Sequence, residues 1–219
     1  FENFQEEFNT DIGLRQYGYL FVTANQERAL NMKTNLDLQK SYGVPVEWLT
    51  PAEIHRLAPF LKSEDLLGGT FCASDGYADS YSIAAGFGSR ARDLGAKVEM
   101  EQTVEKILVN NKSLQGVVTT KDEIHTPCLV NAAGPYASQV GRLAQIEIPV
   151  DPVRRMLVMT EDFPEIPKSI PMTIDADTGF IMRKEAEKVL MGWSDPKEPP
   201  GFNSNFEPSF INVVAEKAL

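Results

Sequence analysis

The sequence has only two cysteines and two histidines among its 219 residues. Cys72 and Cys128 lie in apolar, strand-like surroundings without the spacing of metal ligands, so we predict two buried, reduced thiols and no metal site. Reduced thiols are typical of an intracellular protein, and we expect a cytoplasmic location. No apolar run approaches the roughly 18 residues that a membrane-spanning helix needs. Residues 1–7 also lack the basic start and apolar core of a signal peptide.

Positive charge is also scarce, because 21 Lys and Arg stand against 31 Asp and Glu and the formal net charge is −10. Nucleic-acid phosphates require a basic face, so we predict no nucleic-acid partner. The acidic balance is better explained as a contribution to solubility. We find no Ser-His-Asp or Cys-His set that would indicate nucleophilic catalysis, and no internal repeat or low-complexity tract.

The stretch at residues 126–137 organises the rest of the chain. Cys128–Val130 is a short apolar run that predicts a buried strand, and Pro135 is placed as in the first turn of a helix. Three residues with almost no side chain join these two elements: Ala132, Ala133 and Gly134. A ligand can therefore approach the backbone closely, and an anionic group suits the N–H groups at the start of the helix. The alternative is that these small residues only let the helix pack tightly on the strand.

Alternation and capping residues predict the remaining elements. Helices should begin after Asn25, at the capping box of residues 50–53 and after Asp79 or Ser80, and another should cover residues 210–219. Strands are predicted at residues 13–23, 68–73, 97–101, 104–109, 114–120, 123–125, 155–160, 171–174, 180–183 and 189–193. A hairpin turn at residues 175–179 joins two of them. We expect an α/β (α+β) fold: part of a dinucleotide-binding, Rossmann-like domain with a β-meander, plus a second domain with a mixed or antiparallel sheet.

Eight short motifs follow one another along nearly the whole chain. They are Gly18-Tyr19-Leu20-Phe21, Val46-Glu47-Trp48-Leu49, Gly68-Gly69-Thr70-Phe71, Asp75-Gly76-Tyr77-Ala78-Asp79, residues 129–137, residues 148–155, Thr178-Gly179-Phe180 and Met191-Gly192-Trp193-Ser194-Asp195. In this order they resemble the D-amino-acid-oxidase-like flavoprotein superfamily, and within it the sarcosine oxidase and dimethylglycine dehydrogenase group. The resemblance implies an FAD-dependent oxidase or dehydrogenase that oxidises the C–N bond of a secondary or N-methyl amino acid by hydride transfer to flavin. It also implies a small-molecule amine or amino-acid substrate and leaves room for partner subunits or a protein electron acceptor.

The resemblance also assigns site residues. Flavin contacts fall on Val104, Ala132, Ala133 and Gly134, and substrate contacts fall on Met172, Met182, Ser194 and Arg155. Met182 and Ser194 stand where sarcosine oxidases often have tyrosine and histidine, which argues against sarcosine itself as the substrate. A substrate carboxylate would need a cationic partner, for which Arg154 and Arg183 are further candidates. Core packing is the alternative for Val104 and for both methionines.

The resemblance divides the chain into a discontinuous substrate-binding domain at residues 1–75 and 146–219 and part of an FAD-binding domain at residues 76–145. The family opens with a glycine-rich phosphate turn and closes with a further flavin-contacting strand, and this sequence contains neither. We therefore expect an internal fragment of a longer chain that binds FAD weakly or not at all by itself and is inactive. A cofactor-free binding or assembly subunit that retains the fold is the alternative.

Overall fold

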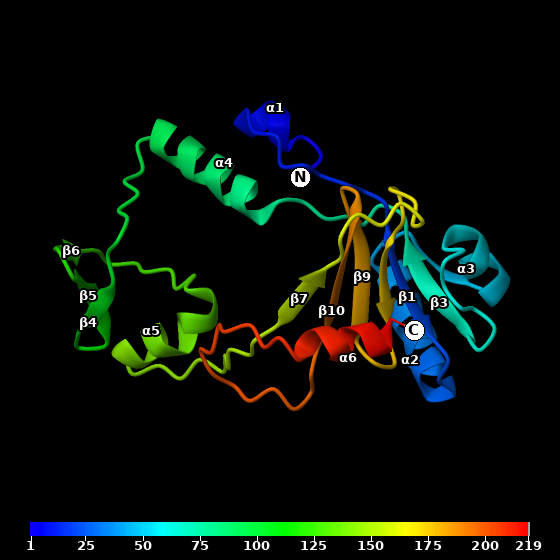
Figure 1. Ribbon diagram of the computed structural model, residues 1–219. Coiled ribbons are helices and arrows are strands. Elements are labelled where there is room, and N and C mark those ends of the chain that lie inside the picture. The colour runs from blue at the N-terminus through cyan, green and yellow to red at the C-terminus, as the bar shows by residue number, and fades with distance from the viewer. Residues whose placement is uncertain (219) are drawn as a thin grey trace. The chain divides into compact units, whose positions relative to one another are not determined.

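The chain folds into two compact units in the computed structural model, which describes residues 1–218 (Figure 1). Unit 1 contains residues 1–87, residues 155–196 and the segment from Phe206 onward. Unit 2 contains residues 88–154 and 197–205. The fold is mixed α/β, with a seven-stranded mixed sheet in unit 1 and a three-stranded sheet in unit 2, as the sequence predicted.

The seven-stranded sheet has the order β2-β3-β1-β8-β9-β10-β7. Its strands are β2 (Val46–Leu49), β3 (Gly68–Cys72), β1 (Tyr19–Thr23), β8 (Met172–Asp175), β9 (Phe180–Glu185), β10 (Lys188–Trp193) and β7 (Met156–Met159). Neighbouring strands are antiparallel except β1 and β8, which pair in parallel with Tyr19 opposite Met172. This parallel pair joins the N-terminal part of unit 1 to the part that follows unit 2 in the chain.

Side chains alternate between the two faces of the sheet, and the register shows which residues share a face. One face packs against α3 (Pro51–Leu57) and α6 (Phe210–Lys217). Under α3 lies a cluster of buried residues: Leu20, Val22, Leu49, Ile54 and Ala58. Under α6 lies a second cluster: Ile170, Phe180, Met182, Val189, Phe210 and Val214. These two clusters form most of the hydrophobic core of unit 1.

The other face is covered at one end by α2 (Gln26–Ser41), whose Leu36 packs against Val46 and Cys72. The contacts of α2 are with β1, β2 and β3. Beyond them, the same face of β8, β9 and β10 carries half-buried side chains, which we call the open face: Met172, Ile174, Ile181, Arg183 and Leu190.

A short helix, α1 (Phe4–Phe8), packs against the first half of α4 (Ser80–Asp93) through aromatic rings. The ring of Phe87 meets Phe4 and Phe8 edge-on, at centroid distances of 5.1 and 4.8 Å. Gly86 permits this approach, because a Cβ there would lie 2.6 Å from the Phe4 ring. Edge-to-face contacts of this kind stabilise aromatic clusters beyond simple burial.

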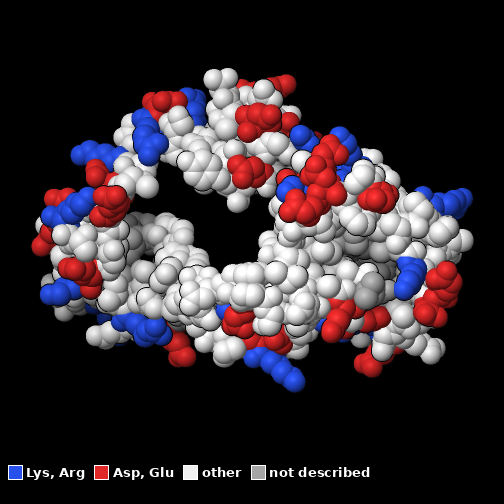
Figure 2. All heavy atoms as spheres, in the orientation of Figure 1, with Lys and Arg blue, Asp and Glu red and all other residues white. Residues whose placement is uncertain are grey.

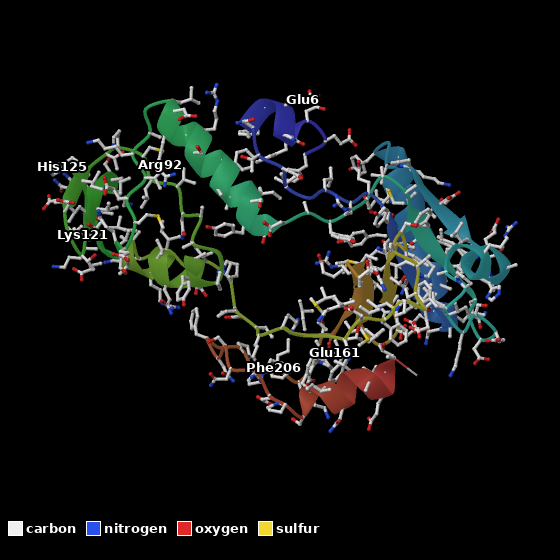
Figure 3. All side chains as sticks on the ribbon, turned by 45° about the horizontal axis from the view of Figure 1, so that its top comes forward. Glu6, Arg92, Lys121, His125, Glu161 and Phe206 are labelled. Atoms are coloured by element: carbon white, nitrogen blue, oxygen red, sulfur yellow. The ribbon has the colours of Figure 1, made fainter. Side chains whose placement is uncertain are left out.

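Unit 2 is built on the antiparallel meander of β4 (Val104–Asn110), β5 (Ser113–Thr119) and β6 (Glu123–His125). Figure 3 labels Lys121 and His125, which both belong to this meander. A 3₁₀ turn, η1 (Gly134–Tyr136), leads into α5 (Ala137–Leu143), which contacts β4.

Most of the locally encoded elements are confirmed. The Asn25 side chain caps α2 by accepting from the Arg28 N–H, Thr50 and Glu53 form the predicted capping box, and Asp79 accepts from the Ser82 N–H before α4. The hairpin turn at residues 175–179 joins β8 to β9. The last helix is confirmed for Phe210–Lys217, and Leu219 lies outside the described residues.

Two predicted strands are wrong, at residues 97–101 and at Cys128–Val130. A strand requires a neighbour that pairs with its backbone N–H and C=O groups, and within residues 1–218 no strand pairs with either segment. The prediction that Cys128–Val130 is buried is also wrong, because Cys128 is exposed and Val130 is 80% exposed. Cys72 is buried as predicted, and both thiols are free.

Candidate functional site

Alternate side chains of β9 point to opposite faces of the sheet, and one face is buried while the other is half-buried. Phe180, Met182 and Lys184 point into the buried side of the sheet. Ile181 and Arg183 point to the open face, where the register places Ile174 beside Ile181 and Leu190 beside Arg183. The open face is therefore apolar around Ile174, Ile181 and Leu190, and it carries charged groups toward the hairpin end of β9, where Arg183 is followed on the same face by Glu185 with Lys188 opposite.

Arg183 is held in place by two neighbours. Its guanidinium carbon lies 4.0 Å from the centre of the Tyr77 ring, and its Nη2 lies 2.7 Å from Glu185 Oε2. The Arg183 side chain is 21% exposed, so it is partly shielded and still reachable from solvent. The Tyr77 hydroxyl donates a hydrogen bond to the Lys184 carbonyl at 2.9 Å. Burial raises the pKa of Tyr77, which keeps the phenol protonated and able to donate.

The four predicted substrate contacts occupy different environments. Met172 is half-buried on the open face, and Ser194 is exposed directly after β10. Arg155 is exposed and precedes β7. Met182 is 9% exposed and packs in the cluster under α6, on the opposite side of the sheet from Met172 and Arg183. The structure thus places Met172 and Arg183 on one surface and Met182 on the other.

Arg154, a further carboxylate candidate, is engaged within unit 2. Its guanidinium donates to both Glu198 carboxylate oxygens at 2.9 and 3.0 Å and to the Asn205 carbonyl at 2.6 Å. Both charged side chains are largely buried, with 9% and 11% exposed. This ion pair fastens residues 197–205 to the segment before β7, and it favours Arg183 over Arg154 as a ligand for an external carboxylate.

The predicted flavin contacts lie in unit 2 at the ends of its elements. Val104 begins β4 and is half-buried, with Thr119 opposite it in the sheet. Ala132 and Gly134 are exposed, and Ala133 is half-buried. The bend is shaped by Asn131, whose side-chain amide donates to the Ala137 carbonyl at 2.9 Å and whose side-chain oxygen accepts from the Ala133 N–H at 3.2 Å.

The bend is open enough to receive a cofactor. A Cβ built on Gly134 meets no heavy atom within 4 Å, and the φ angle of +53° is one that glycine adopts without strain. An open, side-chain-poor backbone is what close approach of a dinucleotide requires. The residues at 132–134 therefore fit the group that the resemblance implies.

The larger cavities lie apart from these residues. In unit 2, a cavity of about 770 Å³ between the meander and α5 is lined mainly by apolar side chains, among them Ile107, Leu129 and Val140. In unit 1, a cavity of about 630 Å³ is lined by the aromatic rings of α1 and Phe87 together with Glu2, Glu7 and Asp75. Neither cavity is lined by a residue predicted to contact flavin or substrate.

Sequence reasoning missed the partnership of Tyr77 and Arg183. In the sequence, Tyr77 belongs to the motif at residues 75–79 and Arg183 is one of three candidate arginines, and nothing connects the two. The signal was weak, because the hydrogen bond between Tyr77 and Lys184 spans 107 positions of the chain.

The charged side chains and the candidate metal ligands were each located on the described residues. Figure 2 shows acidic and basic side chains interspersed over the drawn surfaces. Within residues 1–218, no group of three or more His, Cys, Asp or Glu side chains could hold a metal ion. No helix in this part of the chain has the length and apolar character required to cross a membrane.

The chain is similar to known proteins along its whole length. A family model described as "FAD dependent oxidoreductase" (DAO) matches residues 1–219. The chain is 31% identical over 218 residues to mitochondrial sarcosine dehydrogenase of Homo sapiens, covering 97% of this chain and 22% of that protein. It is 24% identical over 214 residues to the mitochondrial pyruvate dehydrogenase phosphatase regulatory subunit of Mus musculus, covering 96% and 23%. The crystal structure of L-proline dehydrogenase from P. horikoshii superposes with a TM-score of 0.87 at 25% identity, covering 98% of this chain and 57% of that one.

Proposed function

Because this chain belongs to the DAO family of FAD-dependent oxidoreductases, we propose that the protein carrying it oxidises the C–N bond of a secondary or N-methyl amino acid. FAD is the cofactor of this family. The chain spans about a fifth of the length of the sarcosine dehydrogenase that it matches, so the activity and substrate of the whole protein are part of this proposal. That these residues are an internal section of a longer polypeptide stays a prediction.

The observation that carries the amino-acid assignment is Arg183 on the open face. A guanidinium presents several N–H donors in a planar fork that matches a carboxylate. Two of the neighbours of Arg183 on this face, Ile181 and Leu190, are apolar, so a carboxylate that takes the place of Glu185 would be partly shielded from water. Shielding strengthens the pairing of opposite charges.

Each part of the chain has a proposed task in the reaction. Arg183 holds the substrate carboxylate, while Met172 and Ile181 cover the apolar part of a small amino acid and exclude water. The bend at Ala132–Gly134 receives the cofactor along its backbone, and Val104 contributes an apolar contact. Bound FAD supplies the acceptor for the hydride that leaves the carbon next to nitrogen. Arg155 and Ser194 remain predicted substrate contacts.

The direct test uses the full-length protein with its flavin. We expect N-methylglycine, N,N-dimethylglycine or proline to bleach the flavin absorbance under anaerobic conditions. Succinate carries carboxylates and no C–N bond, and it should leave the spectrum unchanged. If no secondary or N-methyl amino acid reduces the flavin and a substrate without a C–N bond does, the amino-acid assignment is wrong. Oxygen uptake compared with dye reduction then separates an oxidase from a dehydrogenase.

The flavin contact at the bend has a matched control in the chain. Gly134 and Gly13 have similar φ angles, +53° and +59°, and a Cβ at either meets no heavy atom within 4 Å. Gly134→Val and Gly13→Val therefore introduce similar backbone strain. We expect the first to weaken FAD binding at least tenfold and the second to leave it unchanged, as measured by fluorescence titration of the apoprotein. Equal loss in both variants would refute a cofactor contact at Gly134.

One comparison favours a second candidate function. A relative of similar coverage is named as a regulatory subunit, which supports the alternative of a binding or assembly subunit. The full-length protein purified from its host decides between them: stoichiometric FAD supports the oxidoreductase, and a protein that neither carries nor takes up FAD supports the regulatory subunit.

Two further assignments remain proposals. We propose that unit 1 contains the substrate-binding part and unit 2 the flavin-binding part. The domain ranges predicted from the sequence differ from the two units at residues 76–87, 146–154 and 197–205. A cytoplasmic location remains a prediction, and fractionation of the host cell tests it against the mitochondrial location in the names of several relatives.

A further inference from the structure

The ring of Tyr77 forms a platform beneath the guanidinium of Arg183. The two groups come from distant parts of unit 1, the segment after β3 and the middle of β9. At 4.0 Å from the ring centre, the guanidinium carbon is within the range of a cation–π interaction. Stacking uses the flat face of the guanidinium and leaves its edge, with the N–H donors, available to acceptors.

The platform is fixed by the backbone on one side. Tyr77 exchanges two hydrogen bonds with Arg15, from the Arg15 N–H at 2.9 Å and from its own N–H at 3.0 Å. Gly76 makes this pairing possible, because a Cβ at that position would lie 2.3 Å from the Arg15 carbonyl oxygen. The ring edge also meets Tyr17 at a centroid distance of 6.5 Å.

The phenol group fixes the platform on the other side. Continuing the register of β8 and β9 places Pro171 opposite Lys184. Proline has no N–H, so the Lys184 carbonyl cannot receive a ladder hydrogen bond from Pro171. The Tyr77 hydroxyl donates to this carbonyl instead, at 2.9 Å. The ring is therefore attached at both ends and cannot turn away from Arg183 without leaving a backbone group unpaired.

The edge of the guanidinium is occupied by a carboxylate of the same strand. Glu185 lies two residues from Arg183, and its Oε2 accepts from Nη2 at 2.7 Å. The Glu185 side chain is 43% exposed, so it can rotate into water at little cost, as exposed ion pairs contribute little stability. Glu185 thus holds the position that an external carboxylate would take.

We propose that Tyr77 is the positioning residue that aims Arg183 at a substrate carboxylate, and that Glu185 is the internal carboxylate that the substrate displaces. The proposal rests on the proposed function and specifies one part of it. Substrate binding is then an exchange of one carboxylate for another on Arg183. Removing the platform weakens the exchange, whereas removing the charge of Glu185 strengthens it. The two substitutions should thus change the affinity for a carboxylate in opposite directions, which merely structural roles of Tyr77 and Glu185 would not produce.

The test uses methoxyacetate, a carboxylate with the shape of N-methylglycine and no nitrogen to oxidise. Its dissociation constant for the full-length flavin-loaded protein is measured by calorimetry. Tyr77→Leu should weaken binding about 5- to 30-fold, as the loss of a cation–π interaction predicts, and Tyr77→Phe, which keeps the ring, should weaken it less. Glu185→Gln should tighten binding about 2- to 5-fold. Glu216→Gln removes the same charge from an exposed side chain of α6, which packs on the other side of the sheet, and it should change nothing.

Kinetics supply the second readout. In the Tyr77 variants we expect KM for the amino acid that reduces the flavin fastest to rise by the same factor as the methoxyacetate dissociation constant, with kcat within about twofold of the wild type. If Tyr77→Leu does not fold, the methoxyacetate affinity of Glu185→Gln still tests the proposal, because the Glu185 side chain is partly exposed and can be changed without disturbing the core. Unchanged or weaker methoxyacetate binding in Glu185→Gln overturns the proposal. Methoxyacetate binding that follows the expected pattern in a protein that oxidises no amino acid refutes the proposed function and leaves the roles of Tyr77 and Glu185 intact.

Discussion

Met182 provides a sharp test, because its position and the family resemblance assign it different roles. The resemblance implies a substrate contact, whereas the structure places the side chain in the cluster under α6 with only 9% exposed. Met182→Ala removes three heavy atoms from a closely packed site beside Phe210 and Val214. Truncations of this kind lower the free energy of unfolding by about 2–5 kcal/mol, while Met182→Leu, which keeps the volume, should lower it by less than about 1.5 kcal/mol.

Urea unfolding of the full-length protein, followed by circular dichroism, measures this difference. With a slope of about 2 kcal/mol per molar urea, the transition of unit 1 should move by about 1–2.5 M in Met182→Ala. Met172→Ala is the control, since Met172 is half-buried on the open face and should lower stability less. KM for the amino acid that reduces the flavin fastest should be unchanged in Met182→Leu. A Met182→Ala variant of nearly wild-type stability whose KM rises tenfold would refute the reasoning and restore the substrate contact.

Three further predictions concern polar contacts. Asp177→Ala removes a carboxylate that accepts from the Thr23 hydroxyl at 2.6 Å and the Ala24 N–H at 2.7 Å, and it should lower the free energy of unfolding by about 1–3 kcal/mol in urea titrations. Arg154→Ala leaves the Glu198 carboxylate without its main partner and should lower the stability of unit 2 by about 3–5 kcal/mol. Proteolysis of residues 197–205 should be faster in this variant. Adding Glu198→Gln to it should cost less stability than Arg154→Ala itself. Hydrogen bonds from the Ser82 hydroxyl and then the Ser82 N–H hold the pKa of Asp79 below its ordinary value. The stabilisation that the ionised Asp79 carboxylate contributes should therefore be present above about pH 4 and lost as the pH falls through its lower folded-state pKa. The difference in unfolding free energy between wild type and Asp79→Ala should then narrow toward about pH 2. A difference that widens there would contradict the role of Asp79 as a helix cap.

Elements with local signals could be predicted from the sequence. The caps at Asn25, Thr50 and Asp79 act within three residues, so the residue types alone mark the start of each helix. The hairpin turn at residues 175–179 is equally local, since the Gly179 N–H donates to the Asp175 carbonyl. Family motifs spread over nearly the whole chain added the cofactor, which no local pattern carries.

Features that depend on distant partners could not be predicted in this way. A short apolar run predicted a strand at Cys128–Val130, but whether a segment pairs depends on what lies beside it in space. The face on which Met182 lies follows from the register of β8 and β9, and a shift of one residue would reverse it. The platform under Arg183 depends on Tyr77, which is far away in the sequence, so no spacing rule could reveal it.

The parallel pairing of β1 with β8 has a consequence for biosynthesis. Tyr19 leaves the ribosome early, but its neighbour Met172 emerges only after all of residues 88–154 have been translated. Until then β1 has β3 on one side and an unpaired edge on the other, and such edges attract other chains. The nascent protein therefore passes through a period in which it depends on rapid elongation or on chaperones, and a slow stretch of codons within residues 88–154 would lengthen that period.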